Sequence, residues 1–293
     1  MIKTKGIRQV AIMVEDLEKS VDFYRRAFDL EPYERQDLRE FGLINAIIPV
    51  GPTILELLQP VDPNSAGARF LKRQGPGLYM LIFEIEDSAG GVKYLKEQGI
   101  PIVWQTESPE YGNIHLHPRA VHGVLIGLGE PRGANPWPPA GANWTPRRQR
   151  GNVRQIRQVA LITEDQDTVV GQYHRLFGIT PARYANLAFG LRAAYAPLGK
   201  SGTVLEFLQP IDPGSAGARF LKERGEGMYL LIMQVRDLDA AVRRAQEAGA
   251  RVTQVVDSGH QRNAWLHPLS TGGVFMQLTQ VTTPGTEWPP TGA

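Results

Sequence analysis

Apolar and polar positions alternate along the first part of the chain in a way that predicts strands and one amphipathic helix. The run IRQVAIMV at 7–14 is dense in β-branched and apolar residues, which is typical of a strand. In the next stretch, 15–28, apolar residues recur at helical spacing and acidic residues fill the first turn, as expected of a surface helix. Two more strands are predicted near 42–49 and 53–58. The chain therefore opens with the order strand, helix, strands.

The same order is predicted a second time within the first half. Pro and Asp in the segment PVDPNS at 60–65 break the chain and lead to a short helix at 65–72. A strand follows at 78–85 and a helix at about 87–98. The remaining strands are predicted near 101–104, 113–117 and 123–128. The pattern indicates an α+β fold in which one group of elements occurs twice.

The second half of the chain repeats the first. Residues 55–72 read LELLQPVDPNSAGARFLK, and residues 205–222, which lie 150 positions later, read LEFLQPIDPGSAGARFLK. Further pairs keep the register, namely Tyr79 with Tyr229, His117 with His267 and, one residue adrift, Trp137 with Trp288. Matches this dense at one offset indicate that a domain of about 150 residues has been duplicated.

The repeat predicts two domains with connecting segments. The domains are expected at 1–130 and 153–280, with a linker at 131–152 and a tail at 281–293. The linker and the tail are rich in Pro, Gly and Trp, and both contain the sequence WPP, so each is expected to lie across its own half as a covering strap. The Arg-rich run PRRQR at 146–150 is interpreted as a solvated connector rather than a phosphate-binding patch.

Composition narrows the class of protein. The chain has 293 residues, of which 42% are hydrophobic and 21% charged, as in ordinary globular proteins of two domains. A net charge of +2 suggests neither a nucleic-acid groove nor a membrane surface. The absence of Cys excludes disulfides, thiolate catalysis and Cys-ligated metals. The start of the chain lacks the apolar core of a signal peptide, so a cytoplasmic location is expected. A small molecule is the expected partner, and a homodimer is left open.

The sequence resembles a known superfamily. The string TILELLQPVDPNSAGARFLKRQGPGLYMLIFEIED, followed by LHP and GVLIGL, resembles the methylmalonyl-CoA epimerase branch of the vicinal-oxygen-chelate superfamily. Glyoxalase I, bleomycin-resistance proteins and extradiol dioxygenases are other members. The resemblance covers 6–129 and again 155–280. It implies tandem domains, each of paired βαβββ modules whose sheets curl into a cup that binds a small ligand.

The resemblance also implies a metal site that this sequence does not complete. Family members hold a divalent metal with two His and two Glu or Gln, one from each of four strands of the cup. The equivalent positions in the two copies are Gln9 and Gln158, Glu56 and Glu206, Met80 and Leu230, and Gly127 and Gln277. Both His ligands are missing from both copies, and the oxygen donors that remain suit hard cations rather than Zn, Fe, Co or Ni. We therefore expect no metal and no other cofactor.

Glu56 and Glu206 are the candidate catalytic bases. Each lies in a predicted strand among apolar residues and is expected to face a cup, which in the first copy would also contain Met80. Burial there should raise the pKa of the carboxyl group toward neutrality, which suits removal of a proton next to a carbonyl. Gln9 or Gln158 would hydrogen-bond to the carboxylate or to the substrate oxygen. The alternative is that Glu and Gln are relics of a ligand set that satisfy each other.

Other candidates lie at strand ends and in loops. His117 and His267 precede Pro at a strand end, where an imidazole is either an acid–base partner or a structural residue. Glu40 aligns with an acidic position near the epimerase active site, whereas the second copy has Ala188 there. The candidate ligand-binding residues are Gln9, Gln158, Met80, Leu230, His115, Trp265, His260, Tyr111 and Gln277. Because His115 corresponds to Trp265, the two cups are expected to differ at the mouth.

Three classes of function remain open from the sequence. The preferred one is a metal-independent isomerase, epimerase or lyase in which Glu56 or Glu206 removes a proton next to a carbonyl. The second is a non-catalytic binder of small molecules, of the resistance type. The third is a pseudoenzyme whose cups are filled by side chains and whose role is assembly. A metal-dependent glyoxalase- or dioxygenase-like enzyme with relocated ligands, such as His115, His117 and Glu56, is a further alternative.

Overall fold

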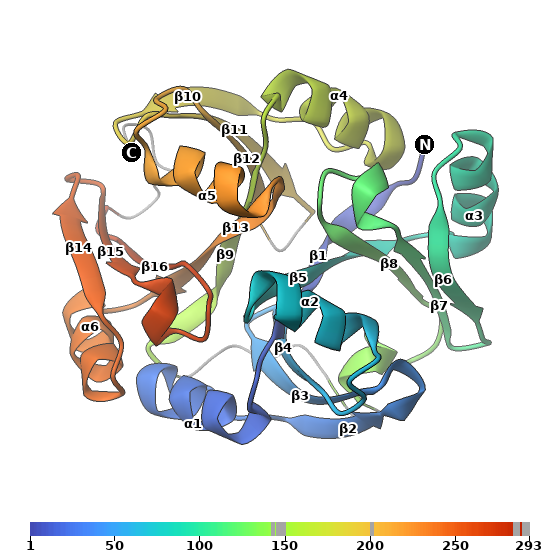
Figure 1. The fold of residues 1–293 in the computed structure, drawn as a ribbon, viewed down its shortest axis with the longest axis horizontal. Coiled ribbons are helices and arrows are strands. Elements are labelled where there is room, and N and C mark those ends of the chain that lie inside the picture. The colour runs from blue at the N-terminus through green and yellow to red at the C-terminus, as the bar shows by residue number, and fades with distance from the viewer. Residues whose placement is uncertain (142–143, 145–150, 200–201, 284–287, 289–293) are drawn as a thin grey trace. The chain divides into compact units, whose positions relative to one another are not determined.

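Four modules of the order βαβββ follow one another along the chain (Figure 1). The computed structural model describes residues 1–141, 144, 151–199, 202–283 and 288. The repeated modules confirm the α+β class and the duplication predicted from the sequence. The run at 146–150 and most of the tail lie outside the described residues, so the interpretations given to them stay predictions.

The first half of the sequence contains two modules joined by a short helix. The elements of the first module are β1 (Thr4–Met13), α1 (Leu17–Phe28), β2 (Glu34–Leu38), η1 (Arg39–Phe41), β3 (Leu43–Val50) and β4 (Thr53–Pro60). The joining helix is α2 (Ala66–Gln74). The elements of the second module are β5 (Gly77–Ile85), α3 (Ser88–Glu97), β6 (Ile102–Glu107), β7 (Tyr111–Leu116), η2 (Pro118–Ala120) and β8 (Leu125–Pro131). A short turn of 3₁₀ helix, η3 (Pro138–Ala140), follows in the linker.

The second half repeats this order. The elements of its first module are β9 (Val153–Ile162), α4 (Gln166–Phe177), β10 (Arg183–Leu187), β11 (Leu191–Leu198) and β12 (Thr203–Pro210). The joining helix is α5 (Ala216–Arg224). The elements of its second module are β13 (Gly227–Val235), α6 (Leu238–Glu247), β14 (Val252–Asp257), β15 (Gln261–Leu266), η4 (Pro268–Ser270) and β16 (Met276–Val281).

Two strands, β2 and β10, are absent from the sequence-based prediction. Both are edge strands, and every residue in them is at least partly exposed. In β2 the sequence is ERQDL, which lacks the apolar alternation of a strand with one buried face. An edge strand needs only one hydrogen-bonded neighbour, here β3, and its polar composition protects the open edge. Periodicity therefore gives no signal for it.

Strand order and register place the candidate residues. The order is β2-β3-β4-β1-β5-β8-β7-β6 for the first half and β10-β11-β12-β9-β13-β16-β15-β14 for the second. β1 is parallel to β4, with Ala11 beside Glu56, and β3 is antiparallel to β4, with Ile47 opposite Glu56. The same pairings in the second half place Tyr195 opposite Glu206.

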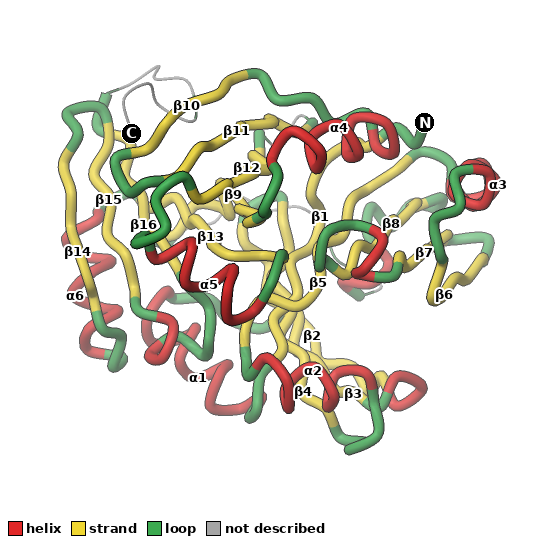
Figure 2. The backbone as a smooth tube through the Cα atoms, turned by 45° about the horizontal axis from the view of Figure 1, so that its top comes forward, coloured by secondary structure: helices red, strands yellow, loops and turns green. Residues whose placement is uncertain are grey.

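Each module has one face covered by its own helix (Figure 2), with α3 against β7 and α4 against β12. Phe207 of β12 packs on Tyr173 of α4 with ring centroids 5.1 Å apart. Because side chains alternate between the faces of a strand, Glu206 lies on the opposite face. Ile114 of β7 likewise lies beside α3, close to Gly91. We call the face away from the covering helix the inner face.

The chain packs into two compact units that each draw on both halves of the sequence. Unit 1 contains Met1–Arg8, Met80–Thr145 and Gln158–Tyr229. Unit 2 contains Gln9–Tyr79, Pro146–Arg157 and Leu230–Ala293. The resemblance to known families implies a cup within each half, whereas the unit that contains Glu56 takes its other strands from the second half. Met80 belongs to unit 1 and Glu56 to unit 2, and a shared cup for the two residues stays a prediction.

The Trp residue of each WPP sequence lies against an arginine of its own half, and the role of the two segments as covering straps stays a prediction. Trp137 and Trp144 are fully buried in unit 1, where the guanidinium carbon of Arg8 lies 5.7 Å and 6.0 Å from their ring centres. In unit 2 the guanidinium of Arg157 lies 5.2 Å from the ring centre of Trp288. Within the described ranges, none of the helices is long and apolar enough to cross a membrane.

Candidate functional site

Glu206 is at the centre of a buried polar cluster on the inner face of unit 1. Nε2 of Gln158 donates a hydrogen bond of 2.6 Å to Oε2 of Glu206. The hydroxyl of Tyr195 also donates to this carboxyl group, and the guanidinium carbon of Arg183 lies 4.8 Å from the centre of the Tyr195 ring. Burial raises the pKa of Glu206 to about 7, against the opposing effects of the hydrogen bonds from Gln158 and Tyr195 and of the charge on Arg183. The carboxyl group is therefore poised to gain or lose a proton near neutral pH.

Glu56 has the equivalent position in unit 2 but different partners. Nδ2 of Asn45 donates to its Oε1, and Nε2 of Gln9 donates to its Oε2, each at 2.6 Å. Asn45 is itself held by Gln36, whose backbone N–H donates to Oδ1 of Asn45 at 3.0 Å. Burial raises the pKa of Glu56, and the two amide hydrogen bonds lower it. Both oxygens of this carboxylate are engaged by amides, which is typical of a structural carboxylate.

The different partners come from different residues at equivalent positions. Strand register makes Asn45 equivalent to Ala193, since both lie opposite the Leu that follows the glutamate by two positions. By the same criterion Ile47 is equivalent to Tyr195. The first copy thus has an amide where the second has alanine, and isoleucine where the second has a phenol. Sequence reasoning missed Asn45, Tyr195 and Arg183, although the mismatch between the copies at these positions is a signal that could have found them.

Unit 1 also contains a module from the first half of the sequence. The inner face of that module carries His115 and Asn113 on β7. Nδ2 of Asn113 and Nε2 of His115 are 3.2 Å apart, and the His115 ring packs against Trp104 with centroids 4.7 Å apart. Burial lowers the pKa of His115 to about 4, so the ring is neutral at pH 7. His115 was a candidate from the sequence, and it shares unit 1 with Glu206 rather than with Glu56.

The equivalent face of unit 2 carries a closed amide network. Nε2 of Gln277 donates to Oδ1 of Asn263 at 3.0 Å and to Oγ1 of Thr279 at 2.9 Å. Oγ1 of Thr279 donates to Oδ1 of Asn263 at 2.9 Å. Trp265 lies directly beside Gln277 in the β15–β16 pair. In the described part of unit 2, hydrogen-bonded polar clusters therefore surround both Glu56 and Gln277.

Met80, Leu230 and Gly127 bring apolar groups to positions that are ligands in the family. Met80 and Leu230 are buried, at 6% and 7% exposure. A Cβ on Gly127 would lie 2.7 Å from Cε of Met80 and 3.0 Å from Cγ1 of Ile82. The space that a ligating side chain would need at position 127 is therefore already filled.

His117 and His267 have a structural explanation. Nδ1 of His117 accepts a hydrogen bond of 3.1 Å from the backbone N–H of Arg119, and Nδ1 of His267 accepts one of 3.2 Å from Leu269. Each ring therefore caps a turn of 3₁₀ helix, η2 or η4. This accounts for both His residues without a catalytic role, and an acid–base role stays a prediction.

The remaining candidates are Glu40, His260 and Tyr111. Glu40 is exposed on the 3₁₀ turn η1 of unit 2. His260 is exposed in the turn before β15, with its Nδ1 3.4 Å from Oγ1 of Thr283. Tyr111 packs edge-on against Trp137 with centroids 5.5 Å apart. Tyr111 thus packs on the linker segment that contains Trp137, and its role in ligand binding stays a prediction.

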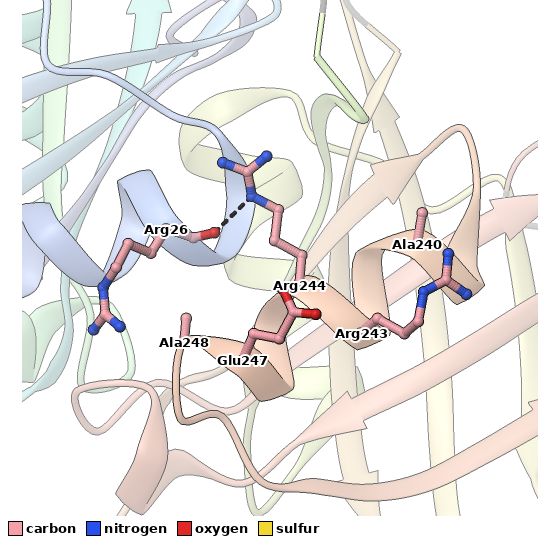
Figure 3. A pocket seen from close by; sticks show the side chains of 6 residues that line it. All are labelled: Arg26, Ala240, Arg243, Arg244, Glu247 and Ala248. Atoms are coloured by element: carbon pink, nitrogen blue, oxygen red, sulfur yellow. Dashed lines mark hydrogen bonds between the residues drawn. The ribbon is translucent and has the colours of Figure 1, made fainter.

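Two open pockets lie away from both glutamates. One lies between α1 and α6 in unit 2 (Figure 3), where Nε of Arg244 donates to the carbonyl oxygen of Arg26 at 2.6 Å. Arg244 also donates to the carbonyl of Arg25 and to Asp29, so it caps the C-terminal end of α1. The other pocket lies beside α5 and is lined mainly by Pro, Ile and Leu side chains. Neither pocket is lined by Glu56 or Glu206.

The fold and this repeated pair of clusters define a tandem protein of the vicinal-oxygen-chelate type. The sequence profile of the Glyoxalase/Bleomycin resistance protein/Dioxygenase superfamily matches residues 8–115 and 157–264, and the chain belongs to this superfamily.

Curated relatives and a solved structure agree with this assignment. An ethylmalonyl-CoA/methylmalonyl-CoA epimerase of Cereibacter sphaeroides is 32% identical over 138 residues, which is 44% of this chain and 99% of the relative. The mitochondrial methylmalonyl-CoA epimerase of Bos taurus is 37% identical over 71 residues, 24% of this chain and 41% of the relative. A mutant of 4-hydroxymandelate synthase from Streptomyces coelicolor shares the fold, with a TM-score of 0.73 at 15% identity over 96% of this chain and 93% of that one.

The residues present do not fit the metal that the family resemblance implies. The glutamates accept hydrogen bonds from the NH₂ groups of Gln9 and Gln158, so these amides present donors, not ligand oxygens, to the carboxylates. Leu230 and Gly127 offer no donor atom, and the thioether of Met80 suits soft cations such as Cu(I) rather than the divalent metal of the family. In the part of the chain that the structure describes, no group of three or more His, Asp or Glu side chains could hold a metal ion. We therefore derive no chemistry through a metal.

Proposed function

We propose that unit 1 catalyses metal-independent proton transfer at a carbon next to a carbonyl group, as an epimerase or isomerase, with Glu206 as the base. The observation that carries the proposal is a buried carboxyl group on an inner face, held by Gln158 and Tyr195, and burial raises its pKa to about 7. A base with a pKa near the working pH combines a large deprotonated fraction with strong proton affinity. The epimerase relatives support this reaction class.

The residues around Glu206 have separate parts in the reaction. The Glu206 carboxylate takes the proton from carbon, and the electrons of the C–H bond form the enolate, with its charge on the former carbonyl oxygen. Gln158 fixes one carboxylate oxygen, which leaves the base in a single orientation. Tyr195 holds the same carboxyl group and rests against Arg183. Delivery of a proton to the opposite face of the same carbon completes an epimerisation, and delivery to a different carbon completes an isomerisation.

A non-catalytic binding role is the second candidate, and unit 2 favours it. Both oxygens of Glu56 are held by amide groups, and the amide network around Gln277 is closed. Each glutamate has two side-chain donors, but both donors to Glu56 are amides, which do not ionise, whereas one donor to Glu206 is the phenol of Tyr195. We propose that unit 2 binds a small molecule without transforming it.

The test is proton exchange in deuterium oxide. The full chain, treated with a chelator, would be incubated with methylmalonyl-CoA, ethylmalonyl-CoA and acetoin, and deuterium at the carbon next to the carbonyl followed by NMR. Glu206→Gln should lower the exchange rate by at least about 100-fold, in line with the loss of a general base. Glu56→Gln is the matched control and should retain the rate. Equal loss in both variants, or full activity in Glu206→Gln, would refute the assignment.

A further inference from the structure

Asn113 has lost the partners that its counterpart in the other copy retains. Asn113 and Asn263 are equivalent, since each pairs with the strand that follows it, opposite Gly129 and Thr279 respectively. Oδ1 of Asn263 accepts hydrogen bonds from Gln277 and Thr279, at 3.0 Å and 2.9 Å.

The donors are missing in the first copy because both are replaced by glycine. Gly127 and Gly129 occupy the positions of Gln277 and Thr279. Oδ1 of Asn113 has no hydrogen-bond partner among the described residues, although the side chain is only 9% exposed. A buried amide oxygen without a donor is costly, and such atoms in a native fold call for a ligand or water.

His115 completes a two-point recognition group beside this oxygen. Its Nε2 is 3.2 Å from Nδ2 of Asn113, and Trp104 holds the ring from the side. A neutral imidazole carries one N–H. If Nε2 accepts from the amide, Nδ1–H of His115 remains as a donor and Oδ1 of Asn113 as an acceptor. If the amide is turned and the other tautomer is present, the polarity is reversed. In both cases the pair offers one donor and one acceptor, and the half-buried His115 ring is reachable from solvent.

We propose that Asn113 and His115 form a recognition site for a small carbonyl compound that carries a hydroxyl or N–H group on the adjacent atom. The donor of the pair binds the carbonyl oxygen, and the acceptor binds the O–H or N–H. This proposal rests on the proposed function, because it makes the bound compound the one whose proton Glu206 removes; both groups lie in unit 1. The donor then also faces the oxygen on which enolate charge develops.

The site differs in charge from one built for an anion. Asn113 and His115 are both neutral at pH 7, since burial lowers the pKa of the His115 ring to about 4. Two-point binding of a neutral head group rejects analogues that lack the donor, because they leave Oδ1 of Asn113 without a partner. The site therefore selects for the hydroxyl or N–H as well as for the carbonyl.

The test uses acetoin and its methyl ether, 3-methoxybutan-2-one, which lacks the O–H. In the full chain with ¹⁵N-labelled His, acetoin should shift the ring nitrogens of His115 and leave those of the exposed His174 unchanged. The ether should bind at least about tenfold more weakly. Asn113→Leu should weaken acetoin binding by about tenfold and remove the preference over the ether. Equal affinity for the two compounds, unchanged binding in Asn113→Leu, or no response of His115, which leaves an ordered water as the occupant, would overturn the proposal.

A variant of the base separates this proposal from the proposed function. Glu206→Gln should abolish deuterium exchange into acetoin while the shift of the His115 ring nitrogens persists. Persistent exchange in Glu206→Gln with an intact shift would refute the role of Glu206 and leave the recognition site standing. Loss of exchange in Glu206→Gln without any shift at His115 would refute the recognition site and leave the base standing.

Discussion

Tyr195 lies directly opposite Glu206 in the antiparallel pair of β11 and β12, and its hydroxyl donates to the Glu206 carboxyl group. The first copy has Ile47 opposite Glu56. There the hydrogen bond to the carboxylate comes from Asn45, two positions before Ile47. Two differences on one strand, Ile47 against Tyr195 and Asn45 against Ala193, thus change how the carboxylate is held. The two copies keep the same acid but give it different surroundings, and the predictions below follow from such differences.

Glu206 should make the stability of the fold fall as the pH rises. Its pKa is raised from 4.5 to about 7, so the folded state binds the proton more tightly than the unfolded state. The stabilisation is complete below the unfolded pKa and is lost as the pH rises through 7. The shift corresponds to about 3 kcal/mol. The free energy of unfolding in urea, measured from about pH 5 to about pH 8, should decline more for the wild type than for Glu206→Gln; parallel curves would contradict the raised pKa.

His115 should show the opposite dependence. Burial lowers its pKa from 6.5 to about 4, so the folded state prefers the neutral ring. The stability it contributes is present above pH 6.5 and is lost as the pH falls through 4. NMR titration of the ring should give a midpoint near 4, and His115→Phe should flatten the acid side of the stability curve. A midpoint near 6.5 would show that the ring is solvated.

Replacing Gly127 should destabilise unit 1. The Cβ of an alanine would lie 2.7 Å from Cε of Met80 and 3.0 Å from Cγ1 of Ile82. Crowding of this kind costs about 1–3 kcal/mol. Gly127→Ala should therefore lower the free energy of unfolding, and adding Met80→Ala should recover part of the loss. The control is Gly171→Ala, because Gly171 lies in a helix and an added Cβ would meet nothing within 4 Å. Gly75 is also in open space, but its φ of +70° would strain an alanine, so it is not a suitable control.

The equivalent residues Asn113 and Asn263 should respond differently to leucine. Asn263→Leu leaves the Thr279 hydroxyl without its acceptor and removes one of the two acceptors of Gln277, and should cost about 1–3 kcal/mol. Asn113→Leu removes a buried oxygen that has no partner among the described residues, so the ligand-free protein should be nearly as stable as the wild type or more stable. Chemical denaturation of both variants compares the two sites directly. A larger loss for Asn113→Leu would mean that its oxygen is already satisfied.

The ion pair of Arg8 with Glu84 has no exact counterpart in the second copy. Arg8 Nε donates to Glu84 at 2.8 Å, whereas the equivalent Arg157 stacks on Trp288 and the residue equivalent to Glu84 is Gln234. Glu84→Gln should cost about 1–3 kcal/mol, because Arg8 loses a charged partner. Gln234→Glu should stabilise by up to about 1 kcal/mol by giving Arg157 a carboxylate. Thermal unfolding at low and high salt would check both, since added salt should reduce the gain.

The sequence predicts the repeat and most elements because both are local or periodic properties. The first helix was expected at 15–28 and is found at Leu17–Phe28, with Asp16 as its N-cap. The edge strand β2 was not predicted, because apolar residues do not alternate with polar ones in its sequence. The partners of Glu56 and Glu206 depend on the register between strands that are neighbours in space, and Tyr195 was invisible as a partner until that register placed it opposite Glu206.

The pairing of the modules into compact units could not be predicted from the sequence either. The repeat shows that the modules are alike, so any of them could pair by the same surfaces, and local pattern cannot decide between them. The resemblance to known families placed Met80 beside Glu56, whereas the structure assigns them to different units. Long-range packing of this kind is set by the whole chain and leaves no local trace.

Each compact unit combines modules from both halves of the sequence, and this has a consequence for the history of the chain. A protein made of one repeat would have to pair with a second copy to build such a unit, and symmetry would then make both sites of the pair identical. Covalent fusion supplies the second copy at high effective concentration and frees the two sites from that symmetry. Genetic change can then alter one site while the other keeps its original task.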